Sequence, residues 1–204
     1  MVKTMRTLAL ASVAVLALAA CNPSAPATPA PETAAPAQAP VAAPAPANVL
    51  TADGFGPLRI GMTRAEVETA LGADSNPGAV GGAEPTACDV FHPARAPEGL
   101  TVMVEDGRLS RITLMRAATI KTADGLGLGA TGAQVKAAHA DAVVEPHKYV
   151  EGAEYITVWN GGRPAVAYVQ DPAARGVRYE TDATGAVTMI HAGGPSIQLV
   201  ESCS

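Results

Sequence analysis

The side chains best suited to acid–base or metal chemistry are few and far apart in the sequence. The four histidines are His92, His139, His147 and His191. No two of them are four residues apart, the spacing that places two zinc ligands on one helix face, and no cysteine–histidine cluster accompanies them. Glu66 and Glu68 lie two residues apart, so a helix points their carboxylates in different directions. The pattern predicts packed or surface histidines, with no catalytic centre, no metal and no cofactor.

Three aromatic residues in the last third of the chain form the clearest candidate binding surface. They are Tyr155, Trp159 and Tyr168, with a pair of glycines between the second and the third. A two-residue turn at these glycines, joining strands at 153–159 and 164–170, places all three rings on one face of a sheet. An open aromatic face suits the binding of a partner or ligand. The alternative is that the rings pack against the other half of the domain or against the C-terminal strand.

Charge and composition exclude one class of partner and divide the chain into regions. The 204 residues include 14 Lys and Arg against 19 Asp and Glu, a net charge of −5, which offers no basic surface to nucleic acid. Lys3 and Arg6 precede an uncharged apolar run at residues 7–18. As a helix this run is about 18 Å long, shorter than the ~30 Å hydrocarbon core of a bilayer. Residues 1–20 therefore have the features of a secretory signal peptide.

The end of this signal has a sequence that specifies more than secretion. Leu18-Ala19-Ala20-Cys21 resembles the bacterial lipobox, in which a leucine and two small residues precede a cysteine. The resemblance implies cleavage before Cys21 and attachment of lipid to that residue, so that the chain is anchored to a membrane. Asn22, by the sorting rule of enteric bacteria, implies the outer membrane, with the domain facing the periplasm. The alternative is an ordinary secretory signal that happens to contain a cysteine.

The segment that follows is a spacer. Residues 22–48 contain eleven alanines, eight prolines and one charged residue. Proline removes backbone donors, and this composition offers too little apolar area to offset the entropy of folding. With Cys21, the segment forms a predicted lipidated, disordered tether at 21–48, whose extended length reaches roughly 80 Å. Its expected role is to hold the domain away from the membrane.

An internal repeat organises the folded part, residues 49–204. The segment 58–67 aligns with the segment 126–135, with leucine, glycine, threonine, alanine and valine identical at five positions. Thr63 and Thr131 each precede a helical pattern, and a glutamate or glutamine follows three residues later. This spacing is that of a capping box, in which side chain and backbone satisfy each other at a helix start. The repeat therefore predicts two similar units, at 49–120 and 121–204.

Each unit is expected to continue from its helix into a run of antiparallel strands. Gly72 ends the first helix. Strands are expected at 87–92, 100–105 and 108–115 in the first unit, and at 153–159, 164–170, 176–181, 186–191 and 197–202 in the second. The fold class is α+β, with two tandem helix-plus-meander units and the helices on one face of the sheet.

The first hairpin leaves two registers open. A two-residue turn at Asp106–Gly107 places Val102 opposite Arg111. A three-residue loop with a bulge instead brings Val102, Val104, Ile112 and Leu114 to one face. We favour the bulged hairpin because it keeps Arg111 away from the core.

Several segments resemble known families. Residues 56–72, GPLRIGMTRAEVETALG, resemble the motif of small BamE-type (SmpA/OmlA) envelope lipoproteins. The tandem helix-then-meander arrangement resembles the β-lactamase inhibitor protein fold. The whole mature domain is similar to uncharacterised proteobacterial lipoproteins that have paired cysteines, a central YETD, here residues 179–182, and a VESC-type end, here residues 200–203.

The cysteines suggest a covalent link between the two units. With Cys21 lipidated, as the lipobox resemblance implies, Cys88 and Cys203 remain as an even pair in an oxidising compartment. A bond between them is expected to stabilise the fold by about 4–5 kcal/mol in the chain-entropy model. The alternative is that both are free thiols, although no C-x-x-C redox motif is present.

Two functional classes follow from these features. The first is a non-catalytic envelope lipoprotein that binds a protein or cell-wall partner through the face containing Tyr155, Trp159 and Tyr168. The second, which the fold resemblance implies, is an inhibitor or modulator of a periplasmic enzyme.

Overall fold

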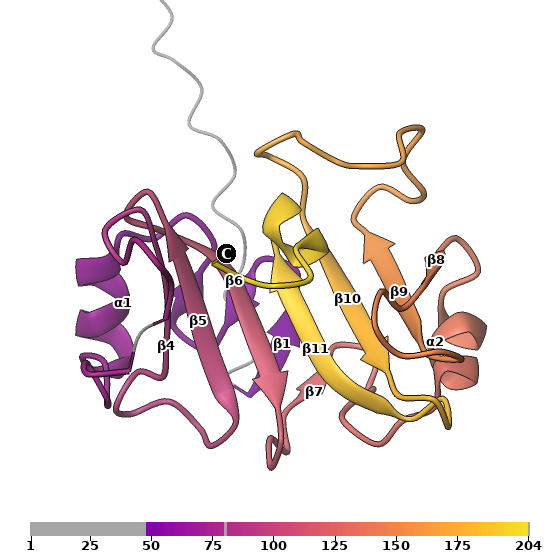
Figure 1. Ribbon diagram of the computed structural model, residues 1–204, viewed down its shortest axis with the longest axis horizontal. Helices are drawn as coiled ribbons and strands as arrows, with labels where there is room; N and C mark the ends of the chain where they lie inside the picture. The colour runs from indigo at the N-terminus through magenta and orange to yellow at the C-terminus, as the bar shows by residue number, and fades with distance from the viewer. Residues whose placement is uncertain (1–47, 80, 204) are drawn as a thin grey trace, which may run out of the picture. The chain divides into compact units, whose positions relative to one another are not determined.

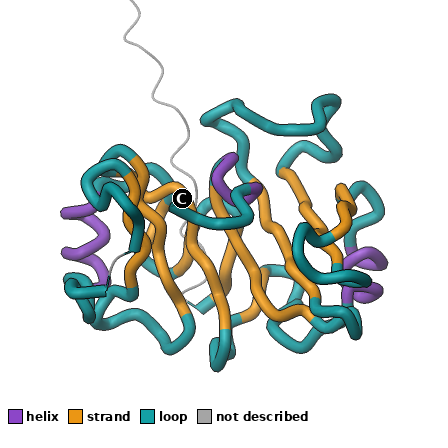
Figure 2. Tube along the Cα trace, viewed as in Figure 1, coloured by secondary structure: helices purple, strands orange, loops and turns teal. Residues whose placement is uncertain are grey.

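A computed structural model describes residues 48–79 and 81–203, which belong to one compact unit. The predicted signal peptide at 1–20, the lipidation site Cys21 and all but the last residue of the tether lie outside the described residues. Within the described residues, no helix is long and apolar enough to cross a membrane. Strands and loops make up most of the domain, together with two short α-helices (Figure 2).

One seven-stranded antiparallel sheet runs through both halves of the domain, in the order β4-β5-β6-β11-β10-β9-β8 (Figure 1). Its strands are β4 (Cys88–Phe91), β5 (Leu100–Glu105), β6 (Arg108–Met115), β8 (Val143–Pro146), β9 (Glu154–Trp159), β10 (Gly176–Thr181) and β11 (Val187–Gly193). The two halves meet where β6 pairs with β11. The predicted strands at 87–92, 100–105, 108–115, 153–159, 176–181 and 186–191 are confirmed to within two residues at each end.

A smaller sheet and the helices cover one face of this large sheet. The small sheet has the order β3-β2-β1-β7, from β1 (Val49–Thr51), β2 (Gly54–Phe55), β3 (Leu58–Arg59) and β7 (Lys121–Thr122). Val67 of α1 (Arg64–Leu71) and Val135 of α2 (Gly132–Ala138) are fully buried in one shared apolar core. Because this core also contains Leu50, Ile112 and Ile156, both helices pack on the same face of the large sheet, as predicted.

The predicted helix starts are confirmed by matching hydrogen bonds in the two halves. Thr63 and Thr131 are N-caps, and each forms a complete capping box with the residue three positions later. The segment before each cap also contacts the meander in the same way. Gly61 N donates to Leu109 O at 2.7 Å, and Gly129 N donates to Val187 O at 2.9 Å. The repeat in the sequence is therefore a repeat in hydrogen bonding.

The hairpin between β5 and β6 corrects the favoured register. Glu105 pairs with Arg108 across a two-residue turn, and both turn residues have positive φ, as a type I′ turn requires. The three-residue loop is therefore wrong. A bulge between Met103 and Val104 nevertheless shifts the pairing beyond the turn, so that Val102 lies opposite Ile112. The bulge turns the Arg111 side chain out of the core, as expected. It lies on the opposite face of the sheet, where it is also buried.

Two predicted strands are wrong. Residues 164–170 form an irregular loop, and β9 pairs instead with β8 and β10 on its two edges. No edge of β9 is left for a third partner. Residues 197–202 also form no strand: a 3₁₀-helix, η1 (Pro195–Gln198), is followed by irregular chain. The carbonyl groups of this segment accept hydrogen bonds from arginine side chains, and so are not available to a strand ladder.

We call residues 194–203 the C-terminal strap. The strap crosses the face of the sheet opposite the helices, and it ends at a disulfide between Cys203 and Cys88, with an S–S distance of 2.04 Å. The predicted pairing therefore joins the end of the second half to β4, the edge strand in the first half. The bond closes a loop with a sequence separation of 115 residues.

Candidate functional site

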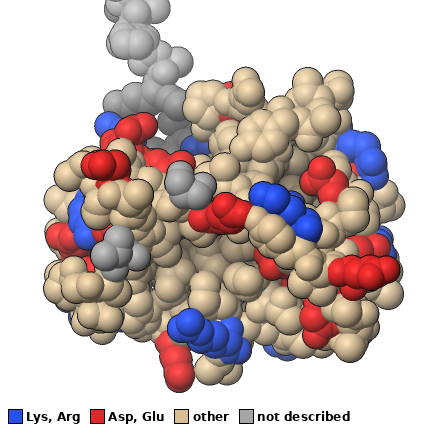
Figure 3. Space-filling model, viewed as in Figure 1, with Lys and Arg blue, Asp and Glu red and all other residues tan. Residues whose placement is uncertain are grey.

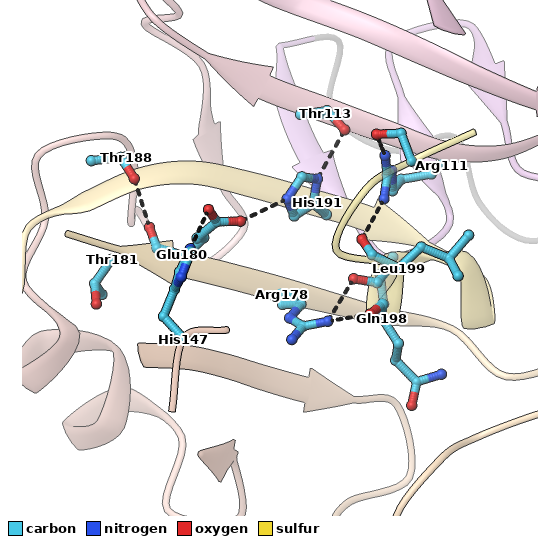
Figure 4. Close-up of polar contacts among 12 residues, drawn as sticks. Arg111, Thr113, His147, Arg178, Glu180, Thr181, Thr188, His191, Gln198 and Leu199 are labelled. Carbon is cyan, nitrogen blue, oxygen red and sulfur yellow. Dashed lines mark hydrogen bonds and ion pairs between the residues drawn. The ribbon is translucent and has the colours of Figure 1, made fainter. Parts of the chain in front are cut away.

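Two buried arginines hold the C-terminal strap against the sheet (Figure 4). Arg111 of β6 is 2% exposed, and its Nη1 donates to the carbonyl oxygens of Ser196 and Leu199, each at 3.1 Å. Its Nη2 donates to the hydroxyl of Ser202. Burial lowers the pKa of Arg111 to about 10; the charge of Glu105 opposes this shift, and the charge of Arg178 adds to it. Arg111 is still charged at neutral pH, so the strap carbonyls compensate a buried cation.

Arg178 of β10 makes similar contacts. It is 4% exposed, and its Nη1 donates to Gln198 O at 2.7 Å and Ile197 O at 3.3 Å. Burial lowers the pKa of its guanidinium, while the neighbouring charge of Glu145 raises it. Arg111 and Arg178 thus bind four successive carbonyl groups of the strap between them.

A row of polar side chains lies beside these arginines, across the seam where β6 of the first half pairs with β11 of the second. Thr113 Oγ1 is 2.9 Å from His191 Nδ1, and His191 Nε2 is 3.5 Å from Glu180 Oε2. Burial lowers the pKa of His191 to about 4, with the charges of Arg111 and Arg178 acting in the same direction and Glu180 opposing them. The imidazole is therefore neutral at pH 7. The geometry assigns its proton to Nε2, since Nδ1 can then accept from the threonine hydroxyl.

Glu180 also accepts a hydrogen bond from a second imidazole, that of His147. His147 Nε2 is 2.9 Å from Glu180 Oε1, and His147 Nδ1 accepts the backbone N–H groups of Tyr149 and Val150 at 3.0 and 3.1 Å. These backbone bonds place the proton of His147 on Nε2, where it is donated to the carboxylate. Burial alone would raise the pKa of Glu180, but the interactions with His191 and His147 outweigh it and lower the pKa.

The row contains a hydroxyl, an imidazole and a carboxylate, the side-chain types of a hydrolytic triad. Catalysis would require a substrate to reach the hydroxyl. Thr113 and His191 are only 5% and 6% exposed, and the cavities at this end of the sheet are lined by other residues. The geometry supports a structural role, in which the row ties β6, β11 and β10 together beneath the strap.

The cavity with the most suggestive lining lies beside Arg178, and we call it the tyrosine–arginine pocket. Its volume is about 200 Å³. The lining residues used below are Glu145, Tyr155, Tyr168, Arg178, Gln198 and Val200. They come from β8, β9, β10, the loop between β9 and β10, and the strap, so the pocket forms only when these segments fold together.

The floor of the pocket is a stack of planar groups. The guanidinium carbon of Arg178 lies 3.8 Å from the centre of the Tyr155 ring, and the His147 ring is stacked on Tyr155 at 4.5 Å. Glu145 Oε2 is 3.9 Å from Arg178 Nη2, too long for a hydrogen bond. Arg178 Nε is buried and has no hydrogen-bond partner among the described residues. One edge of a buried cation thus lacks the hydrogen bonds that burial normally demands.

The predicted aromatic face is divided by the structure. Tyr155 and Tyr168 both line the tyrosine–arginine pocket, where Tyr155 is 4% exposed and Tyr168 is 50% exposed. Trp159 lies elsewhere: it packs with Val169 and with Ile197 of the strap in a small second core. For Trp159 the alternative interpretation, packing against the C-terminal segment, is therefore the correct one. Tyr168 does not lie opposite Tyr155 in a hairpin, because residues 164–170 form a loop.

Arg178 and Glu145 were not among the predicted site residues. The signal for Arg178 was present, since residues 176–181 alternate between core side chains and the charged pair Arg178 and Glu180. Two charged residues on one face of a central strand indicate that this face is polar and covered. For Glu145 no comparable signal exists, because β8 is short and three of its four residues are exposed.

Within the described part of the chain, no group of three or more histidine, cysteine, aspartate or glutamate side chains could hold a metal ion. No family model, curated protein or solved structure matches the chain.

Proposed function

We propose that the chain is a lipid-anchored, non-catalytic binding module of the bacterial envelope, which presents its domain to a protein or cell-wall partner. The observation that carries this proposal is the tyrosine–arginine pocket. It combines a half-exposed ring, Tyr168, with a buried cation, Arg178, whose Nε has no hydrogen-bond partner in the described part of the chain. Aromatic and arginine side chains in a desolvated pocket are the usual anchors of recognition sites.

The N-terminal sequence supports the proposed location. A signal peptide at 1–20, the lipobox ending in Cys21 and the Ala/Pro-rich tether are the parts that a lipoprotein needs. The Cys88–Cys203 disulfide is suited to an oxidising compartment such as the periplasm. In this proposal the lipid holds the chain at the outer membrane, and the two similar halves are tandem units related to the BamE-type and β-lactamase inhibitor folds.

Recognition, rather than catalysis, is favoured by the places where polar groups are exposed. The hydroxyl–imidazole–carboxylate row is buried, whereas the pocket that opens at the surface has rings, a guanidinium and one carboxylate in its lining. Nucleic acid is not the expected partner. On the face seen in Figure 3, acidic and basic side chains are interspersed and form no continuous basic surface.

Crosslinking in cells followed by affinity capture tests the proposal. We expect Tyr168→Ala to lose the captured partner, because it removes the exposed ring of the pocket without disturbing a buried group. The matched control is Tyr149→Ala, which removes a ring outside the pocket lining that is 60% exposed, against 50% for Tyr168. Equal capture by the wild type and both variants would contradict the proposed site.

The anchor is tested separately. Cells supplied with a labelled fatty acid should incorporate it into the wild-type chain and not into Cys21→Ser. Label in both forms, or in neither, would contradict the assignment of Cys21 as the lipidated residue.

A further inference from the structure

We infer that the tyrosine–arginine pocket binds the C-terminal carboxylate of a peptide whose last residue is small. This inference rests on the proposed function and names the chemistry that the pocket recognises. The group that would bind the carboxylate is the guanidinium of Arg178. Its Nη1 donates to two carbonyl groups of the strap, at 2.7 and 3.3 Å, and is fully used by them.

The other edge of the same guanidinium is buried without hydrogen bonds among the described residues. Nε has no partner among the described residues, and Nη2 has only the Glu145 carboxylate at 3.9 Å. Nε and Nη2 together form the side edge of arginine, two parallel N–H groups that match the two oxygens of a carboxylate. Because Arg178 is 4% exposed, a carboxylate bound there forms charge-assisted hydrogen bonds with a cation that is shielded from bulk water.

Glu145 supplies a negative charge beside Arg178. It lies on β8, directly opposite Tyr155 of β9, so both side chains point to the same face as Arg178. Its carboxylate balances the buried cation but does not reach hydrogen-bonding distance. Its side chain is 50% exposed, which lets it move aside at low cost. A ligand carboxylate therefore competes with Glu145 for Arg178.

The walls of the pocket favour the end of a peptide over its middle. The lining combines sheet residues with Tyr168 of the β9–β10 loop and with Gln198 and Val200 of the strap. A volume of about 200 Å³ holds a carboxylate and a small side chain. An internal residue would need an exit for the chain in both directions. Half-exposed Tyr168 and Val200 offer apolar contacts to the residues before the carboxylate.

Nuclear magnetic resonance can test this inference on the full mature chain with Cys21→Ser, which retains the tether and domain. The probe is N-acetyl-Ala-Ala, and the readout is the Nε–Hε resonance of Arg178. We expect this resonance to shift with saturation. The same peptide with a C-terminal amide should bind at least tenfold more weakly, because it lacks the charge that pairs with the guanidinium. Equal binding of acid and amide would overturn the inference.

A pair of charge variants makes the test specific. Glu145→Gln removes the competing carboxylate and should tighten N-acetyl-Ala-Ala binding about fivefold at low salt. Glu98→Gln removes an exposed glutamate in the first half and should leave the affinity unchanged. No tightening in Glu145→Gln, or equal tightening in both variants, would overturn the competition. Both positions are exposed and both substitutions keep the shape of the side chain, so neither removes a packed group.

A third probe separates the source of the carboxylate. Aspartate with both ends blocked carries the same charge on a side chain. Binding as tight as that of N-acetyl-Ala-Ala would contradict a site for chain ends. If capture in cells depends on Tyr168 but none of these probes shifts the Arg178 resonance, the proposed function stands and this inference falls. If the probes bind but capture is independent of Tyr168, the proposed function falls.

Discussion

The two halves of the domain share a pattern of elements, but their edges differ. In both, a capped helix packs beneath strands of one sheet, and the segment before the cap contacts the meander through equivalent backbone bonds. In the first half the edge strand β4 is covered, because Gly81 lies so close to Val90 that a Cβ there would be 2.5 Å from its backbone. In the second half β8 ends the sheet and pairs with β9 alone.

The second half also exposes the apolar surface. The large hydrophobic residues that are exposed in the described chain are Val144, Tyr149, Val150, Val166, Tyr168 and Val200. All of them follow α2 in the sequence. The connection from β9 to β10 covers residues 160–175, whereas the equivalent connection from β4 to β5 covers only 92–99. The first half thus has a covered edge strand, whereas the second half has a longer loop and the exposed apolar side chains that the proposed binding surface uses.

The two halves meet at a seam in the centre of the large sheet, where β6 pairs with β11. Leu109 and Val187 receive equivalent hydrogen bonds from the segments before the two helices. Thr113 and His191 each follow these residues by four positions, and they pair with each other across β6 and β11. Equivalent positions therefore face one another at the centre of the sheet, where they have diverged into a donor and an acceptor.

The largest effect is expected from the covalent link between the halves. Replacing both Cys88 and Cys203 with serine should lower the free energy of unfolding by about 4–5 kcal/mol. The disulfide joins residues with a sequence separation of 115, and without it the unfolded chain regains the conformational entropy that this link removes. Urea unfolding of the mature chain measures this. The Cys21→Ser form serves as the reference, since it keeps the disulfide. A loss below 1 kcal/mol would show that the strap is held without it.

The second-largest loss of stability is expected from replacing Arg111, because this side chain of the first half binds the strap through hydrogen bonds. Arg111→Met leaves two strap carbonyls and the Ser202 hydroxyl without their donor, which should cost about 3–4 kcal/mol. Arg95→Met is the matched control: Arg95 is exposed and donates to one carbonyl, Thr69 O, so its loss should be within about 0.5 kcal/mol. Similar losses in both variants would mean that the strap does not depend on buried arginine.

The seam should make stability depend on pH. The pKa of His191 is about 4 in the folded domain, below its ordinary value of 6.5. The unfolded chain therefore binds more protons between these values, and stability should fall as the pH falls through this window, by about 2 kcal/mol between pH 7 and pH 5.

The control for this prediction is His191→Gln, which should remove most of the slope in urea unfolding measured above pH 5. Glu180 acts in a different window: because its pKa is lowered, its contribution is lost only below its ordinary value of 4.5. A slope that is unchanged in His191→Gln would assign the pH dependence to other groups.

The smallest effect tests the equivalence of the two helix starts. Thr63→Ala removes a capping box with Glu66, Thr131→Ala removes one with Gln134, and each change should cost about 1 kcal/mol. Thermal unfolding of the two single variants measures this difference directly. If one cap costs more than twice the other, the two halves differ in stability as well as in surface.

Much of the fold was predictable because its signals are local. The threonine caps and the glycine that ends α1 act within a few residues, and the strands around the Asp106–Gly107 turn alternate as their pairing requires. The candidate site was only partly predictable. Tyr155 and Tyr168 were identified from residue type, but the hairpin that was expected to join them does not exist. Trp159 was grouped with them by alternation along a strand, although the strap covers it.

The sequence by itself determined the repeat, the two capped helices, six of the large sheet's strands and the cysteines able to pair. These depend on short spacings and on residue chemistry that no distant contact overrides. Only the tertiary structure decided that β8 takes the edge of β9, that the C-terminal segment crosses the sheet as a strap, and that Arg178 meets Tyr155 and Glu145 in one pocket. Such choices depend on competition between distant segments for the same edge or carbonyl group, and a local pattern contains no record of which competitor is bound more favourably.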